Sequence, residues 1–143
     1  KMRVQPRFYP VSRLLLGMFV LIAASVYSYK AQAGTEPPPI PRGVAMKSWH
    51  ENGSGGQYLL QLYQGRSLKV DKPISGTVTG DANCDADAEG LSHCHNTIEL
   101  ANGNKITVIN THEMHRHRCL GAGDKISLKG IGGSWIMGAL PAE

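Results

Sequence analysis

Short runs in which apolar and polar residues alternate recur along the second half of the chain and predict β-strands. Turns rich in glycine and asparagine separate these runs, and no stretch after residue 43 has a convincing helical period. We therefore expect a mainly β domain over residues 43–143, built as a small five-stranded barrel or sandwich. The predicted strands are residues 74–80 (ISGTVTG), 96–100 (NTIEL), 105–111 (KITVINT), 124–130 (DKISLKG) and 134–140 (SWIMGAL).

A further hairpin is expected before these strands, from residues 44–50 to residues 58–64. The segment between them, ENGSGG at residues 51–56, is typical of a flexible turn. Residues 57–65 are short, and their tyrosine and leucine content suits a strand as well as a helix.

The hairpin of residues 96–100 and 105–111 has the strongest turn signal, because ANGN joins the two strands. The apolar residues of both strands fall on one face if the loop contains three residues, 102–104. That register predicts that Cys94 pairs with His112 on the core side of the sheet.

The sequence resembles small exported OB-fold β-barrel proteins over residues 70–140. The resemblance is carried by GTVTG, the ANGN hairpin, GAGDKISLKG and SWIMGAL. It implies an OB-like five-stranded barrel and supports the fold, without assigning an activity. The layout also looks like the membrane-anchored haem chaperones of cytochrome c maturation. The chain lacks their histidine in an HDEKY context, so a haem-carrier role is not expected.

The N-terminal region predicts a membrane anchor. Residues 14–29 contain no charge and are flanked by Arg13 and Lys30. We expect a transmembrane signal anchor over 14–30, and a cleaved signal peptide ending at AQA (31–33) is the alternative. The basic tip, 1–13, would stay in the cytoplasm of a bacterial cell, and the rest would be exported through the inner membrane as a single-pass, periplasmic domain. The linker, 31–42, is proline-rich and predicts a stiff spacer.

The charge distribution argues against a nucleic-acid partner. The chain has 15 Lys and Arg residues, 11 Asp and Glu residues and a net charge of +4. Four of the basic residues lie within the first 13 positions, so the exported part is balanced. The expected partners are the lipid bilayer and integral membrane protein subunits.

Histidines and cysteines concentrate in two segments, SHCHN (92–96) and HEMHRHRC (112–119). Sulfur and imidazole ligands suit Cu(I) or Zn²⁺, although neither Cys-x2-Cys nor His-Glu-x-x-His spacing is present. If residues 112–119 continue as an extended strand, one face carries three potential ligands. The candidate metal ligands are Cys94, His112, His115, His117 and Cys119, with Met114 added for copper.

A disulfide competes with this metal site, because exported proteins experience an oxidising environment. We expect Cys84 to pair with Cys94, since they bracket a loop between two strands, and Cys94 with Cys119 is the rival pairing. Three cysteines leave one over in either case.

Other chemical motifs are weaker. DADAEG (85–90) matches the start of a calcium loop, but Asn96 stands where such a loop ends in glutamate. The haem-attachment pattern fails because residue 91 is leucine. The chain has no nucleophile elbow or phosphate loop, and we expect no enzyme activity. An enzyme would need a pocket lined by the histidines of residues 112–117 with Glu113 or Glu99.

The leading functional expectation is a single-pass accessory or scaffold subunit of a multi-subunit inner-membrane complex of respiratory or photosynthetic type. It depends on the anchor, the stiff spacer and the lack of a catalytic constellation, and it requires no cofactor. The alternative is a membrane-tethered periplasmic Cu- or Zn-binding protein for metal delivery or storage.

Overall fold

The computed structural model describes residues 36–142. The predicted cytoplasmic tip, the anchor and most of the linker lie outside these residues. Among the described residues, no helix is both long and apolar enough to span a bilayer.

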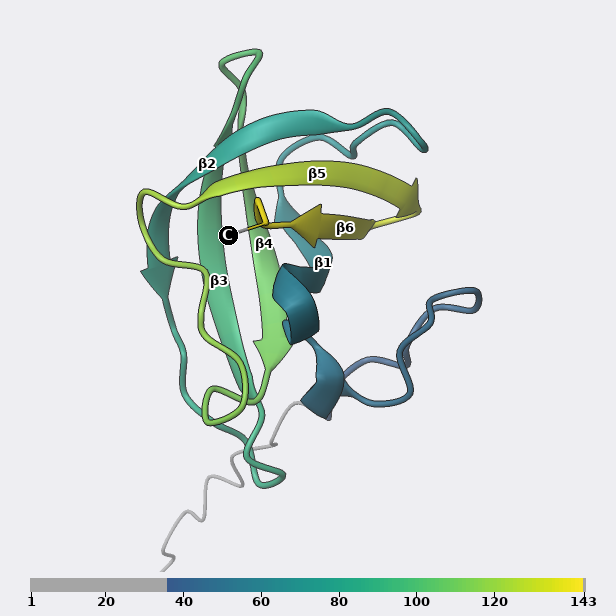
Figure 1. Cartoon of the computed structure of the whole chain (residues 1–143), viewed down its shortest axis with the longest axis vertical. Helices are drawn as coiled ribbons and strands as arrows, with labels where there is room; N and C mark the ends of the chain where they lie inside the picture. Colours follow the sequence, from purple (N-terminus) through teal and green to yellow (C-terminus); the bar gives the residue numbers. More distant parts are fainter. Residues whose placement is uncertain (1–35, 143) are drawn as a thin grey trace, which may run out of the picture. The chain divides into compact units, whose positions relative to one another are not determined.

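Six antiparallel strands form a closed barrel in the order β1-β4-β3-β2-β5-β6 (Figure 1). The mainly β prediction is confirmed, and β2–β6 correspond to the five strands expected from the alternating pattern. The bounds are β1 (Gln57–Gln64), β2 (Ile74–Ala82), β3 (Ser92–Leu100), β4 (Lys105–His112), β5 (Lys125–Gly132) and β6 (Trp135–Ala139).

The strand number was wrong by one, because β1 belongs to the barrel. Without it, β4 and β6 would be the two free edges of a five-stranded sheet. β1 pairs with both, for example Gln61 with Ile109 of β4 and Leu60 with Ile136 of β6. Closure leaves no unpaired edge, and at this coarse level the barrel is consistent with an OB-like fold.

The predicted hairpin between residues 44–50 and 58–64 is wrong. Instead of a strand, the first segment contains bends and a 3₁₀ helix, Trp49–Glu51. The reason lies in β1, which is apolar on both faces. Leu60 points into the barrel core, whereas Leu59 packs outside it in a second cluster with Trp49 and Leu91. Residues 40–49 therefore cover the outer face of β1.

The β3–β4 hairpin has the predicted core face but a shifted register. Ile98 lies opposite Ile106, and Cys94 lies opposite Asn110 instead of His112. The loop has three residues as expected, but they are residues 101–103 and not 102–104. The N–H of Leu100 donates to the carbonyl of Asn104 at 2.8 Å and closes the loop. Gly103 takes a positive φ of 84°, the conformation that ends a three-residue hairpin loop. A two-residue shift in pairing leaves every side chain on its predicted face.

A buried asparagine completes the junction between β1 and β4. The Asn52 side chain is 1% exposed and donates to the carbonyls of Leu59 (2.9 Å) and Thr111 (2.8 Å). Its Oδ1 accepts from the N–H of Leu59 at 2.6 Å. Asn52 thus links the two strands beyond their last directly paired residues.

The loop from Glu113 to Asp124 is tied to the barrel at several points. The Tyr58 hydroxyl donates to the Arg118 carbonyl at 2.7 Å, and the Asn96 amide donates to the Leu120 carbonyl at 3.0 Å. Arg118 also donates to both carboxylate oxygens of Asp124, at 2.7 and 3.2 Å. These contacts fix the position of Cys119 within the loop.

We expect Asn52→Ala to destabilise the barrel by about 2–4 kcal/mol, because it leaves three buried backbone groups without a partner. Urea unfolding followed by circular dichroism measures this change. Asn102→Ala is the control: its side chain bonds the N–H of Asn104 in an exposed loop, and it should cost less than about 1 kcal/mol. Equal losses in the two variants would contradict the linking role of Asn52.

The stability of the loop should depend on the charge of Asp124. Its hydrogen bond from Arg118 is the main reason why the pKa of this carboxyl group lies below its ordinary value. Because the pKa of Asp124 is lower in the folded state than in the unfolded state, where it is about 3.9, the charged carboxylate stabilises the fold above that pH. This stabilisation is lost as the pH falls through the pKa of the folded state. Asp124→Asn should therefore cost about 1 kcal/mol at neutral pH and progressively less below about pH 4.

Unfolding measured between neutral and acidic pH tests this expectation. Glu99→Gln is the matched control, because Glu99 lies 3.9 Å from Lys105 in an exposed pair. A difference between wild type and Asp124→Asn that stays constant with pH would refute the contribution of the ion pair.

Candidate metal centre

The interior of the barrel is divided into an apolar end and a polar end. Inward-facing residues near the 101–103 loop are aliphatic, including Ile98, Leu100 and Ile106. Towards the start of β3 and the end of β4, the same alternation brings polar residues inside. These buried residues are Ser92, Cys94, Asn96, Asn110 and His112.

Three potential metal ligands meet at the polar end. The sulfur atoms of Cys94 and Cys119 and a ring nitrogen of His112 all lie within 4.8 Å of one another. Cys94 and His112 are 0% exposed, and Cys119 is half-buried. Although Cys94 and His112 are not directly paired, they are diagonal neighbours on the inner face, which is close enough for side-chain contact.

His112 has a free ring nitrogen in this buried position. Its Nδ1 lies 3.3 Å from the carbonyl of Asn110, whereas Nε2 is buried without a hydrogen-bond partner. Burial lowers the pKa of the imidazole, and the Asn110 carbonyl only partly opposes this effect. The ring is therefore neutral at pH 7. When Nδ1–H donates to Asn110, Nε2 carries the lone pair that a metal ion requires.

Two buried amides next to the cluster also have unsatisfied atoms, Oδ1 of Asn96 and Nδ2 of Asn110. Neither amide was among the ligands expected from the sequence, although the alternation contained the signal. Asn96 has the same parity as Ile98 on β3, and Asn110 has the same parity as Val108 on β4. Since a buried polar atom without a partner costs free energy, these atoms require partners from outside the protein, either water or an ion.

The Cys119 thiol is free and protonated in the absence of a metal ion. Burial raises the pKa of this thiol, and the nearby charge of Asp81 raises it further. Such a thiol is a poor nucleophile, because the thiolate is the reactive form. A cation bound beside it would displace the proton.

The predicted disulfide between Cys84 and Cys94 is confirmed, and the rival pairing of Cys94 with Cys119 is wrong. The two sulfur atoms of the rival pair are nevertheless neighbours. Cys84 and Cys94 also lie near a carboxylate oxygen of Asp81, all three atoms being within 4.8 Å of one another. Cys94 therefore belongs to both groups of potential ligands found among residues 36–142.

The extended continuation of residues 112–119 is wrong. The N–H groups of Arg116 and His117 both donate to the Glu113 carbonyl at 3.0 Å, which forms a turn directly after β4. His115, His117 and Cys119 consequently do not share one strand face. Cys119 returns to the cluster through the loop, whereas neither of the two histidines is part of it. Met114 is 45% exposed.

Other residues singled out by the sequence have structural partners. Asp87 in the acidic loop accepts from the N–H groups of Glu89 and Leu91 and lies 2.8 Å from His93. Glu113, a candidate acid for catalysis, is 2.7 Å from His50. The hydrogen bond with His50 is the main cause that lowers the pKa of Glu113.

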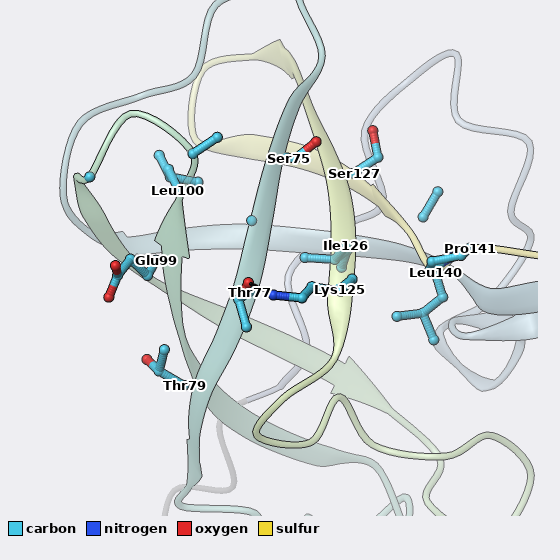
Figure 2. A pocket seen from close by; sticks show the side chains of 14 residues that line it. Ser75, Thr77, Thr79, Glu99, Leu100, Lys125, Ile126, Ser127, Leu140 and Pro141 are labelled. Atoms are coloured by element: carbon cyan, nitrogen blue, oxygen red, sulfur yellow. Dashed lines mark hydrogen bonds between the residues drawn. The ribbon is translucent and has the colours of Figure 1, made fainter.

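A separate groove of about 850 Å³ crosses the β2–β5 pairing (Figure 2). Leu140 and Pro141 lie along one side, whereas Leu100 and Ile126 belong to the barrel core and are only 5% and 2% exposed. Lys125 donates to the Thr77 hydroxyl at 2.8 Å and is held across β2. None of the three clustered ligands lines this groove.

Comparisons of this chain with known proteins found no matching family model, no matching curated protein and no matching solved structure.

Proposed function

We propose that this chain is a metal-binding protein whose β-barrel, once the Cys84–Cys94 disulfide is reduced, holds one Zn²⁺ or Cu⁺ ion with Cys94, His112 and Cys119. The observation that carries the proposal is the buried Nε2 of His112, which has no partner and belongs to a side chain grouped with two sulfur atoms. Two thiolates and one imidazole suit these two ions better than the oxygen-preferring Mg²⁺ or Ca²⁺.

The polar end of the barrel meets several requirements of such a site. The three residues come from β3, β4 and the tied loop, so the scaffold places them close together before the ion arrives, and reduction of the disulfide then frees the Cys94 sulfur. The contact from Nδ1 to the Asn110 carbonyl orients the ring, as is usual for metal-binding histidines. Three protein ligands leave a fourth coordination position for water or for a donor from another molecule.

The open position gives a donor from another molecule access to the ion, and Cys119 is only half-buried, which suits a role in metal delivery or storage. We propose that residues 14–30 tether the protein to the bacterial inner membrane, with the N-terminus in the cytoplasm and the barrel in the periplasm. The uncharged stretch, the flanking basic residues and the proline-rich spacer support this topology.

The fully reduced chain should bind one Co²⁺ or Zn²⁺ ion, and His112→Gln should weaken the binding by more than the roughly 10–100-fold that loss of a supporting partner costs. His115→Gln is the matched control, because His115 is exposed in the turn after β4. Absorption bands of Co²⁺ bound to thiolate report the ligands, and competition with a chromophoric chelator gives the Zn²⁺ affinity. Lack of binding by the reduced wild type, or equal losses in both variants, would refute the site.

A second candidate function is the accessory-subunit role, in which the exported barrel braces integral membrane subunits. The groove across β2 and β5 favours it, because apolar residues there are rimmed by Ser75, Thr77 and Ser127. This role is compatible with metal binding, since the groove and the cysteine cluster use different residues.

If the groove holds a partner, Ser127→Arg should reduce the amount of other membrane subunits that co-purify with the chain after gentle detergent extraction. The bulk and charge of arginine would obstruct the groove, which Ser127 lines together with Leu140 and Pro141. Ala122→Arg adds the same charge to an exposed turn and should leave co-purification unchanged. Recovery of the wild type without a stoichiometric partner would exclude the accessory role.

A further inference from the structure

We propose that the Cys84–Cys94 disulfide is a redox gate on the metal centre: oxidation withdraws Cys94 from the ligand set, and reduction returns it. The inference rests on the proposed function and adds its regulation. It assigns a role to Cys84, which is not among the three clustered ligands.

The gate follows from the shared use of one sulfur atom. Cys94 Sγ is bonded to Cys84 and is also within 4.8 Å of the His112 ring nitrogen and the Cys119 sulfur. A disulfide sulfur carries no thiolate charge, and the thiolate is the form that binds metal. The oxidised protein therefore offers only His112 and Cys119, whereas the reduced protein offers all three ligands.

The difference in burial determines how the gate opens. Cys94 is 0% exposed, whereas Cys84 is half-buried in the segment after β2. A thiolate of an external dithiol reductant therefore attacks Cys84 Sγ. The bond between Cys84 and Cys94 breaks, a mixed disulfide forms on Cys84, and Cys94 leaves as a thiolate.

The second thiol of the reductant completes the reaction. It attacks the first sulfur of the reductant, which is bonded to Cys84 in the mixed disulfide. The reductant thereby becomes an internal disulfide, and Cys84 is released as a thiol. Two electrons have passed from the dithiol to the protein, and its two protons are available to Cys84 and Cys94. When a metal ion binds, the protons of Cys94 and Cys119 are released.

The charges around Cys94 favour coupling between reduction and metal binding. A carboxylate oxygen of Asp81 lies within 4.8 Å of the sulfurs of Cys84 and Cys94. This negative charge opposes an isolated Cys94 thiolate, whereas a cation beside the thiolate offsets the repulsion. Released Cys94 is thus stabilised most when the metal site is filled.

Thermodynamic linkage makes the coupling measurable. An ion that binds only the reduced form raises the reduction potential of the disulfide, by about 30 mV for each tenfold increase in free metal above the dissociation constant. Redox titration of the full 143-residue chain with a dithiol buffer, at several free Zn²⁺ concentrations, gives this slope. A potential independent of Zn²⁺ would overturn the gate.

The decisive comparison uses the full chain as wild type and as Cys84→Ser. The reduced wild type should bind Zn²⁺ more tightly than the oxidised wild type, again by more than the roughly 10–100-fold effect of losing a supporting partner. Cys84→Ser cannot form the gating bond and should bind equally tightly in oxidising and reducing buffer. Cys119→Ser is the control: it keeps the Cys84–Cys94 disulfide, lacks one ligand and should bind weakly in both buffers.

The outcomes separate the gate from the metal site itself. If reduced wild type and Cys84→Ser both fail to bind Zn²⁺, the proposed function is wrong and the gate falls with it. If both bind and the oxidised wild type binds equally well, the metal site stands and the gate is wrong. If Cys84→Ser loses Zn²⁺ on oxidation and peptide mapping finds a Cys94–Cys119 bond, Cys84 is not the gating residue.

Discussion

Closure of the barrel by β1 is the constraint on which the rest of this structure depends. A sheet of β2–β6 alone would expose the backbone groups of β4 and β6 and would leave its inner face open. β1 pairs with both edge strands, and the Asn52 side chain supplies the missing hydrogen bonds where direct pairing with β4 ends. Inside the closed barrel His112 is fully buried.

Packing at the apolar end of the barrel offsets the free-energy cost of the buried polar atoms at the other end. Burial of aliphatic residues on β3, β4 and β5 gives the favourable free energy of folding, at about 25 cal/mol for each Å² of apolar surface removed from water. Part of it offsets the cost of the unsatisfied atoms of Asn96, Asn110 and His112. Proteins retain such costs mainly where the polar groups serve a ligand, which is how we interpret this end of the barrel.

Cys94 connects the two chemical features of the domain. Its strand position fixes the sulfur on the inner face, next to His112, while the segment after β2 brings Cys84 to the same atom. The loop of Cys119 is held by Tyr58, Asn96 and the Arg118–Asp124 pair, so the third sulfur is also fixed. The Cys94 sulfur therefore takes part in the disulfide of the domain and also belongs to the proposed metal site.

The sequence by itself determined the features that depend on local patterns. The position of Cys84 and Cys94 at the two ends of a loop made them the expected disulfide. Alternation placed five strands and located Cys94 and His112 on the inner face. These inferences hold because side-chain parity along a strand is a property of the backbone alone.

The tertiary structure decided which distant segments meet. The sixth strand, the cover over Leu59 and the turn that separates His115 and His117 from Cys119 depend on packing between segments far apart in the chain. The same holds for the return of Cys119 to Cys94, because Tyr58 and Asn96 fix the loop from strands that precede it by many residues. Local alternation carries no information about such contacts, since it specifies the face of a residue and not its neighbour.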